Sequence, residues 1–133
     1  MFIGNNDLII TQRYKGESHR GVDLRTWDFN KKELMGIVTP ERLFVMRYGL
    51  DGYANYFLVG RGLNSDAILK FIHIDNKFFN VGDVLMKFEK IGFSKIGGNS
   101  TAHHLHFETW LSEEEHINPV NYLHDMRIKY KYV

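Results

Sequence analysis

Short runs of β-branched and aromatic residues, separated by glycine, asparagine and aspartate, recur along the chain, whereas helical periodicity is hard to find. The clearest run is LFVMRYGLDGYANYFLVGR at 43–61, where GLDG lies between two apolar stretches. Glycine adopts the positive φ angles that hairpin turns require, so we expect an antiparallel hairpin there. VGD at 81–83 is a second turn signal of the same kind. These patterns predict a mainly β fold with little helix.

Two segments depart from this pattern. RTWDFNKKELMGIVTPER at 25–42 is less regular, and we expect a loop there that leads into a strand. Near the end, Asn118 and Pro119 follow an acidic run and precede a short apolar pattern, which predicts a turn or one short helix. The chain has 133 residues, no repeat and no linker-like stretch. We therefore expect a single domain that covers residues 1–133.

Composition and charge exclude several classes of function. The formal net charge is +1 and the Lys and Arg residues are scattered, so we expect no nucleic-acid partner. The sequence MFIGNNDLII at 1–10 has no basic leader and no long apolar run, so we expect neither a secretory signal nor membrane insertion. There is no cysteine, and a bound metal would therefore need His and carboxylate ligands.

The sequence TAHHLHFE at 101–108 has three histidines in four positions. Alternate side chains of a strand share a face, so His104 and His106 would point one way while His103, Leu105 and Phe107 point the other. Two imidazoles about 7 Å apart on one face can work at a single centre. Leu105 and Phe107 would anchor the strand in the core. The alternative is a polar strand face with incidental histidines.

Two further segments hold candidate residues, each with an ordinary structural explanation. In SHRGVDL at 18–24, His19 and Asp23 stand four residues apart, and Gly21 favours a loop that lets them converge. A surface ion pair or a cap is the usual explanation of such a pair. In KFIHIDN at 70–76, His73 lies in an apolar run, where a lone histidine is more often a core residue with a satisfied hydrogen bond.

Considered together, these residues indicate a metal site. His19, Asp23 and His106 supply two imidazoles and one carboxylate, the donor set of a catalytic zinc site that keeps its fourth position for water. Such a site performs Lewis-acid chemistry. His73 and His104 remain for proton transfer and for stabilising an oxyanion. The combination predicts metal-assisted amide hydrolysis.

The chain resembles the M23 peptidases, the lysostaphin-like or LytM-type zinc endopeptidases of bacterial cell walls. SHRGVDL is similar to the HxGxD motif of that family, and TAHHLHFE is similar to its HLHFE motif. GYANYFLV at 52–59 resembles the family's GYGNYV strand. The sequence from 70 to 100 follows the pattern of a His-bearing strand, a Val-Gly-Asp turn and a Gly-rich approach, and INPVNYL at 117–123 resembles the closing NPxxYL. The five segments occur in the same order as in the family.

The resemblance implies one zinc ion per chain, bound by His19, Asp23 and His106. It implies that His104 is the general base or water-positioning residue and that His73 is the second catalytic histidine. His103 matches no functional residue of the family. The implied fold is an antiparallel β-sheet groove of the lysostaphin-like type. The implied activity is that of a zinc-dependent endopeptidase acting on peptide cross-links or stem peptides of peptidoglycan.

Some positions depart from the family pattern. TPERLFV at 39–45 lacks the glycine of the usual strand entry, and Ala54 replaces the second glycine of GYGNYV, which affects local geometry more than metal binding. Without a signal or a wall-binding domain, we expect a bacteriophage product, either a lysin or a virion component that reaches the wall after release or delivery. Two alternative functions remain. The first is a non-catalytic component of a wall-remodelling complex or of a phage tail, with tail proteins as partners. The second is a metallohydrolase that acts on another amide.

Overall fold

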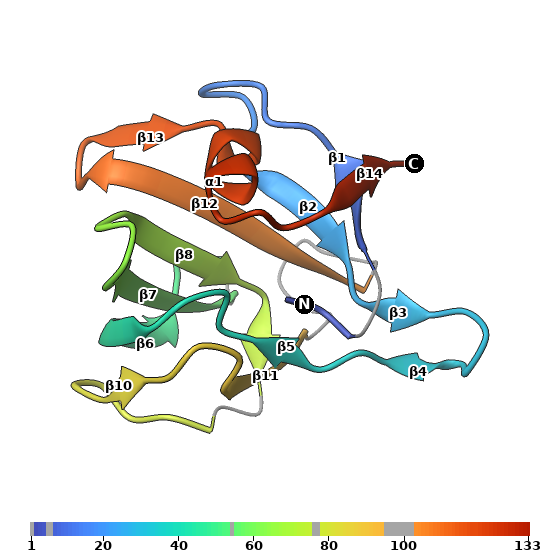
Figure 1. Cartoon of the computed structure of the whole chain (residues 1–133), viewed down its shortest axis with the longest axis horizontal. Helices are drawn as coiled ribbons and strands as arrows, with labels where there is room; N and C mark the ends of the chain where they lie inside the picture. Colours follow the sequence, from blue (N-terminus) through green and yellow to red (C-terminus); the bar gives the residue numbers. More distant parts are fainter. Residues whose placement is uncertain (1, 5–6, 54, 76–77, 95–102) are drawn as a thin grey trace.

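The computed structural model describes residues 2–4, 7–53, 55–75, 78–94 and 103–133, which form one large sheet, two small ones and a single helix (Figure 1). The large sheet has the strand order β10-β6-β7-β8-β12-β2-β1-β14, and β13 pairs with β12. Every strand pair in it is antiparallel except β1 with β14. Its strands are β1 (Leu8–Gln12), β2 (Val22–Arg25), β6 (Leu43–Leu50), β7 (Tyr56–Gly62), β8 (Ile68–Ile72), β10 (Val84–Leu85), β12 (His104–Ser112), β13 (Glu115–Ile117) and β14 (Tyr130–Tyr132). The mainly β, largely antiparallel fold is as predicted.

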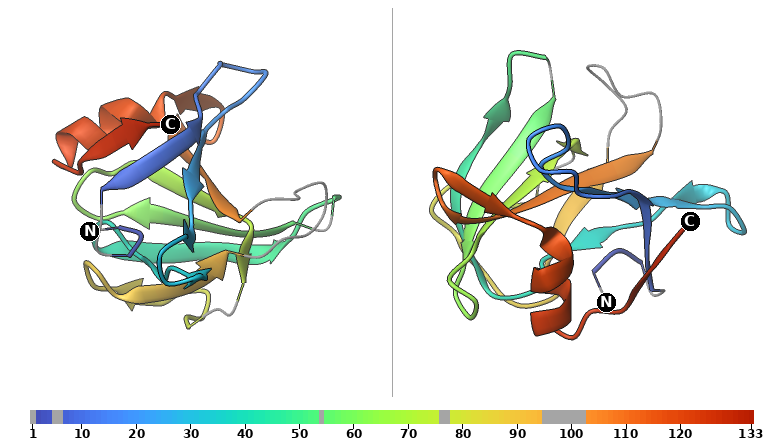
Figure 2. Two further views of the ribbon diagram at one scale, coloured as in Figure 1. Left: turned by 90° about the vertical axis from the view of Figure 1, so that its right-hand side faces the viewer. Right: turned by 90° about the horizontal axis from the view of Figure 1, so that it is seen from above.

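The remaining elements lie around this sheet. β5 (Ile37–Val38), β11 (Lys90–Ser94) and β9 (Ile74–Asp75) form a three-stranded sheet, and β3 (Trp27–Asp28) pairs with β4 (Glu33–Leu34). The helix α1 (Pro119–Asp125) begins after Asn118, whose side chain accepts a hydrogen bond from the Val120 N–H. Figure 2 shows β1 and β14 side by side at one edge of the large sheet.

The sequence-based expectations for local structure are mostly confirmed. The hairpin at 43–61 is β6 and β7, a turn occurs at 81–83, and α1 is the expected short helix. The segment 25–42 leads into the strand β6 as expected, but it is not simply a loop, because it contains β3, β4 and β5. Ala54 and the segment 95–102, which includes the Gly-rich approach and Ala102, lie outside the described residues.

Alternation along the central strands gives the large sheet a core face and an opposite face. Phe71 of β8 and Phe107 of β12 are fully buried. The ring of Phe2 packs edge-on against both, with ring centroids 6.1 Å apart for Phe71 and 5.1 Å apart for Phe107. Complete burial of such a side chain contributes about 1.5–3 kcal/mol. The same face also buries Val22, Leu24, Leu58, Leu69 and Leu105. On the opposite face, which we call the site face, lie Asp23, Arg25, His104, His106 and Glu108.

In the part of the chain that the structure describes, no helix has the length and apolar character that a membrane crossing would need.

Candidate metal centre

The pairing of β2 with β12 brings the first two candidate ligands together. His106 lies directly opposite Asp23 in this antiparallel ladder, and His104 lies opposite Arg25. Directly opposite residues point to the same face and have Cβ atoms about 4.5–5.5 Å apart. Leu105 and Phe107 are fully buried on the other face, and they hold β12 in the register that faces both histidines toward Asp23.

Gly21 permits the close contact between this pair of strands. A Cβ atom at Gly21 would lie 2.3 Å from the backbone oxygen of Phe107, closer than real Cβ atoms approach. The segment between His19 and Asp23 can therefore lie directly on β12 only because this residue has no side chain. This is a packing reason for the glycine in the SHRGVDL sequence.

His19 comes from the loop that precedes β2, and contacts with β13 hold that loop. His116 of β13 lies between Tyr14 and Glu17 of the loop: the Tyr14 O–H donates to its Nδ1 over 2.9 Å. The Nε2–H of His116 donates to the Glu17 carboxylate over 2.6 Å. Within the loop, the Lys15 N–H donates to the His19 carbonyl over 2.8 Å. These bonds fix the backbone that presents the His19 ring.

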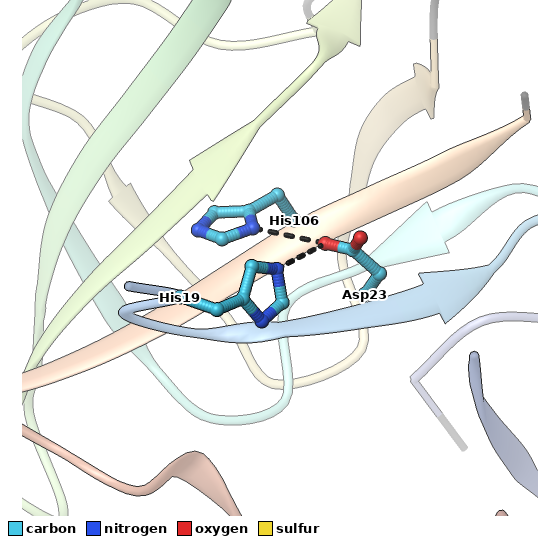
Figure 3. A group of neighbouring side chains, drawn as sticks. All are labelled: His19, Asp23 and His106. Atoms are coloured by element: carbon cyan, nitrogen blue, oxygen red, sulfur yellow. Dashed lines mark hydrogen bonds and ion pairs between the residues drawn. The ribbon is translucent and has the colours of Figure 1, made fainter. Parts of the chain in front are cut away.

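The side chains of His19, Asp23 and His106 converge on one point (Figure 3). Asp23 Oδ1 lies 3.3 Å from His19 Nε2 and 2.9 Å from His106 Nδ1. The three ligand atoms all lie within 4.8 Å of one another. Ligand atoms about 2.0–2.1 Å from a tetrahedral zinc ion are about 3.3 Å apart, so the two distances to Asp23 Oδ1 are close to those around such an ion.

The hydrogen bonds of the ring nitrogens that point away from Asp23 are also consistent with a bound cation. The Nδ1–H of His19 donates to the Arg13 carbonyl over 2.6 Å, and the Nε2–H of His106 donates to Glu108 over 2.8 Å. When neutral, each ring then turns a nitrogen lone pair toward Asp23. Acceptors of this kind on metal-ligating histidines fix the ring and its tautomer. Three electron-pair donors that face one another need a positive charge between them.

The charges around His106 attract a cation even without a metal. Burial alone would lower the pKa of His106, but its hydrogen bonds with Asp23 and Glu108 raise the pKa to about 9. Burial works in the opposite direction on the two carboxyl groups, yet the bonds to His106 hold the pKa of both Asp23 and Glu108 below the usual values. In the metal-free protein at pH 7 a proton therefore supplies the positive charge.

The two other candidate histidines lie together beside this cluster. The rings of His73 and His104 meet edge-on with centroids 4.9 Å apart, and His104 Nε2 lies 3.8 Å from Asp23 Oδ2. His73 follows the last residue of β8 with a φ of 74°, in the left-handed region that non-glycine residues seldom adopt. We attribute the turn of this ring toward His104 to that backbone conformation. Burial, followed by the neighbouring imidazoles, lowers the pKa of His73 to about 4.

His103 does not behave as the alternation pattern predicts. It precedes β12 and is only half-buried, whereas Leu105 and Phe107 are fully buried. Its ring stacks on Trp27 with centroids 5.0 Å apart. Sequence reasoning also assigned no role to Glu108, which bonds both His106 and the Trp110 N–H. The signal was present, because Glu108 follows His106 by two residues in a strand and so shares its face.

Comparison with known proteins gives a relative in sequence over part of the chain. No family model matches the chain. A segment of 58 residues is 40% identical to a protein of Buchnera aphidicola subsp. Baizongia pistaciae named an uncharacterized metalloprotease. This segment is 44% of the chain and spans 15% of the length of that relative.

Solved structures match much more of the chain. The catalytic domain of lysostaphin from Staphylococcus simulans has a TM-score of 0.66 at 20% identity, covering 86% of this chain and 88% of that one. The catalytic domain of a mutant of the prophage-encoded M23 protein EnpA from Enterococcus faecalis has a TM-score of 0.63 at 18% identity, covering 91% of each chain. A zinc-containing peptidase from Vibrio cholerae has a TM-score of 0.59 at 19% identity, covering 87% of this chain and 36% of that one. The resemblance to the M23 peptidases therefore holds for the fold.

Proposed function

We propose that this chain, which has the fold of the lysostaphin-like M23 catalytic domains, is a zinc-dependent endopeptidase that hydrolyses peptide bonds of bacterial peptidoglycan. The observation that carries the proposal is the convergence of His19, Asp23 and His106, with His73 and His104 beside them. A relative named as a metalloprotease and a zinc-containing peptidase with the same fold agree with it. We treat residues 1–133 as one peptidase domain.

In this proposal His19, Asp23 and His106 hold one zinc ion per chain. Bound zinc would polarise a carbonyl group and lower the pKa of water. His104 takes the proton of the attacking water at a ring nitrogen and returns it to the leaving amine. His73 is neutral at pH 7 because its pKa is about 4, and as a neutral ring it donates one N–H to the oxyanion of the tetrahedral intermediate.

The test combines metal content with hydrolysis of purified peptidoglycan. We expect about one zinc per chain by elemental analysis, with lysis that a chelator stops and added zinc restores. New amino groups should appear without new reducing ends, because peptide bonds and not glycosidic bonds break. New reducing ends would contradict the proposal, and one zinc without lysis on walls of several chemotypes would favour a non-catalytic role.

The biological setting is also part of the proposal. We propose that the substrates are peptide cross-links or stem peptides and that a bacteriophage supplies the protein, which reaches the wall at host lysis or with the virion. The fold likeness to a prophage-encoded M23 protein supports this origin. Lysis of cells only when the protein is added from outside, or produced together with a membrane-permeabilising phage protein, would agree with delivery of this kind.

Glu108→Gln is expected to weaken zinc binding about 10- to 100-fold. The amide has one acceptor oxygen where the carboxylate has two, so it cannot accept from both His106 and Trp110. It also lacks the negative charge that makes the imidazole a better ligand. Competition with a chromophoric chelator measures the affinity without reference to activity. Glu113→Gln is the matched control, since Glu113 follows β12 and forms an exposed ion pair with Arg47. Equal affinities for wild type and Glu108→Gln would show that Glu108 has no positioning role.

A further inference from the structure

A cavity of about 430 Å³ lies beside His104 on the site face. We call it the Arg25 pocket. Its lining residues come from β1, β2, β3 with the turn that follows it, and β12 with the residue before it. They are Thr11, Arg25, Trp27, Phe29, His103 and His104. None of these residues is a proposed zinc ligand, and the function proposed above uses only His104.

The walls of the Arg25 pocket are aromatic and its one permanent charge is positive. Trp27 stacks on His103 with an interplanar angle of 15°, and Phe29 is 65% exposed. The guanidinium of Arg25 lies 5.1 Å from the centre of the Phe29 ring. Among the described residues, no carboxylate lines this cavity and no ion pair involves Arg25. Arg25 also lines a neighbouring cavity with Asp7 and Asp28, but it forms an ion pair with neither. A partly buried arginine without an ion-pair partner can bind an anion from outside the chain.

The sheet register fixes the distance between this pocket and the candidate metal centre. Arg25 lies directly opposite His104, and Asp23 lies directly opposite His106, one step further along the same face. Successive pairs on one face are about 6.6–6.8 Å apart, which is two residues of strand. This is about the distance between neighbouring side chains on one side of an extended peptide. A peptide with one bond at the metal centre can therefore place a nearby side chain in the Arg25 pocket.

We propose that the Arg25 pocket is a substrate subsite for a carboxylate on a short aliphatic stem, close in the peptide to the cleaved bond. The stem packs on the Trp27 and Phe29 rings, and the two carboxylate oxygens receive N–H donors of the Arg25 guanidinium. This inference rests on the proposed endopeptidase and names its substrate class: an acidic peptide with a free carboxylate beside the scissile bond, in preference to the carboxamide.

The first test measures hydrolysis of purified cross-linked wall peptides with their carboxylates either free or converted to carboxamides. We expect wild type to prefer the free carboxylates by about 10- to 100-fold in kcat/KM, mostly through KM. Arg25→Gln should lose this preference, with little change on the carboxamide form, and Arg25→Lys should keep part of it. Arg61→Gln removes an equal charge from an exposed pair with Asp66 and is the control. Thermal melting identifies any variant that fails to fold.

A binding measurement separates failure of this inference from failure of the proposed function. The probes are acetyl-Gly-Glu-Gly-amide and acetyl-Gly-Gln-Gly-amide, titrated into the zinc-free protein while the indole N–H resonance of Trp27 is followed by NMR. Binding of the acidic probe alone, lost in Arg25→Gln, supports the subsite even if no wall peptide is hydrolysed. Hydrolysis with equal rates on both wall substrates overturns the subsite and leaves the endopeptidase intact. Equal binding of both probes also overturns it.

Discussion

Replacing His106 with alanine is expected to remove both zinc and peptidase activity, with zinc affinity falling by more than about a hundredfold. His106 supplies one of three donor atoms, and its other nitrogen bonds to Glu108. Without the ring, Asp23 and Glu108 both lose their hydrogen bond to His106. We therefore also expect the metal-free variant to be less stable than wild type by about 1–3 kcal/mol.

The measurement pairs elemental analysis and chelator competition with lysis assays on the same preparation. His124→Ala is the matched control, because it removes an exposed imidazole of α1 that bonds only the Tyr130 hydroxyl among the described contacts. The control should bind about one zinc and lyse walls at the wild-type rate. A His106→Ala protein with wild-type zinc affinity would show that the metal lies elsewhere.

The prediction of the fold succeeded where two-residue alternation is long enough to be visible in the sequence. β12 has nine residues, and Leu105 and Phe107 alternate with His104 and His106 over its first half, so the pattern is visible without a structure. β3, β4 and β5 have two residues each, too few to show any period. They form because distant segments pair with them, as when Lys90 of β11 pairs with Val38 of β5. The local sequence does not indicate which distant strand will pair with such a segment.

The prediction of the site has the same limit. The donor chemistry of His19, Asp23 and His106 was readable from residue types, and the structure brings their ligand atoms together. The hydrogen bond between His116 and Glu17, which holds the His19 loop, could not be predicted from the sequence, because the two residues are 99 positions apart. The Arg25 pocket was missed for a similar reason: the role of Arg25 depends on its register with His104, which only the strand pairing reveals.

His104→Ala is expected to keep zinc and to lose about 10²- to 10⁴-fold in kcat. The His104 ring lies beside the candidate ligands, with its Nε2 3.8 Å from Asp23 Oδ2. It supplies none of the three converging ligand atoms, which come from His19, Asp23 and His106. Elemental analysis and single-turnover hydrolysis of one wall peptide, on the same samples, measure both quantities. If the variant turned over at a near-normal rate, His104 would not be the base.

His73 provides the companion variant that shows whether the two histidines act as a unit. Asparagine is the replacement to use, because it tolerates the left-handed backbone at this position better than other residues with a side chain. His73→Asn should also keep zinc and lose rate. If the proton transfer by His104 and the N–H of His73 serve one transition state, the double variant will be only slightly slower than the slower single variant. Losses that multiply would instead mean that the edge-on contact of the two rings has no part in catalysis.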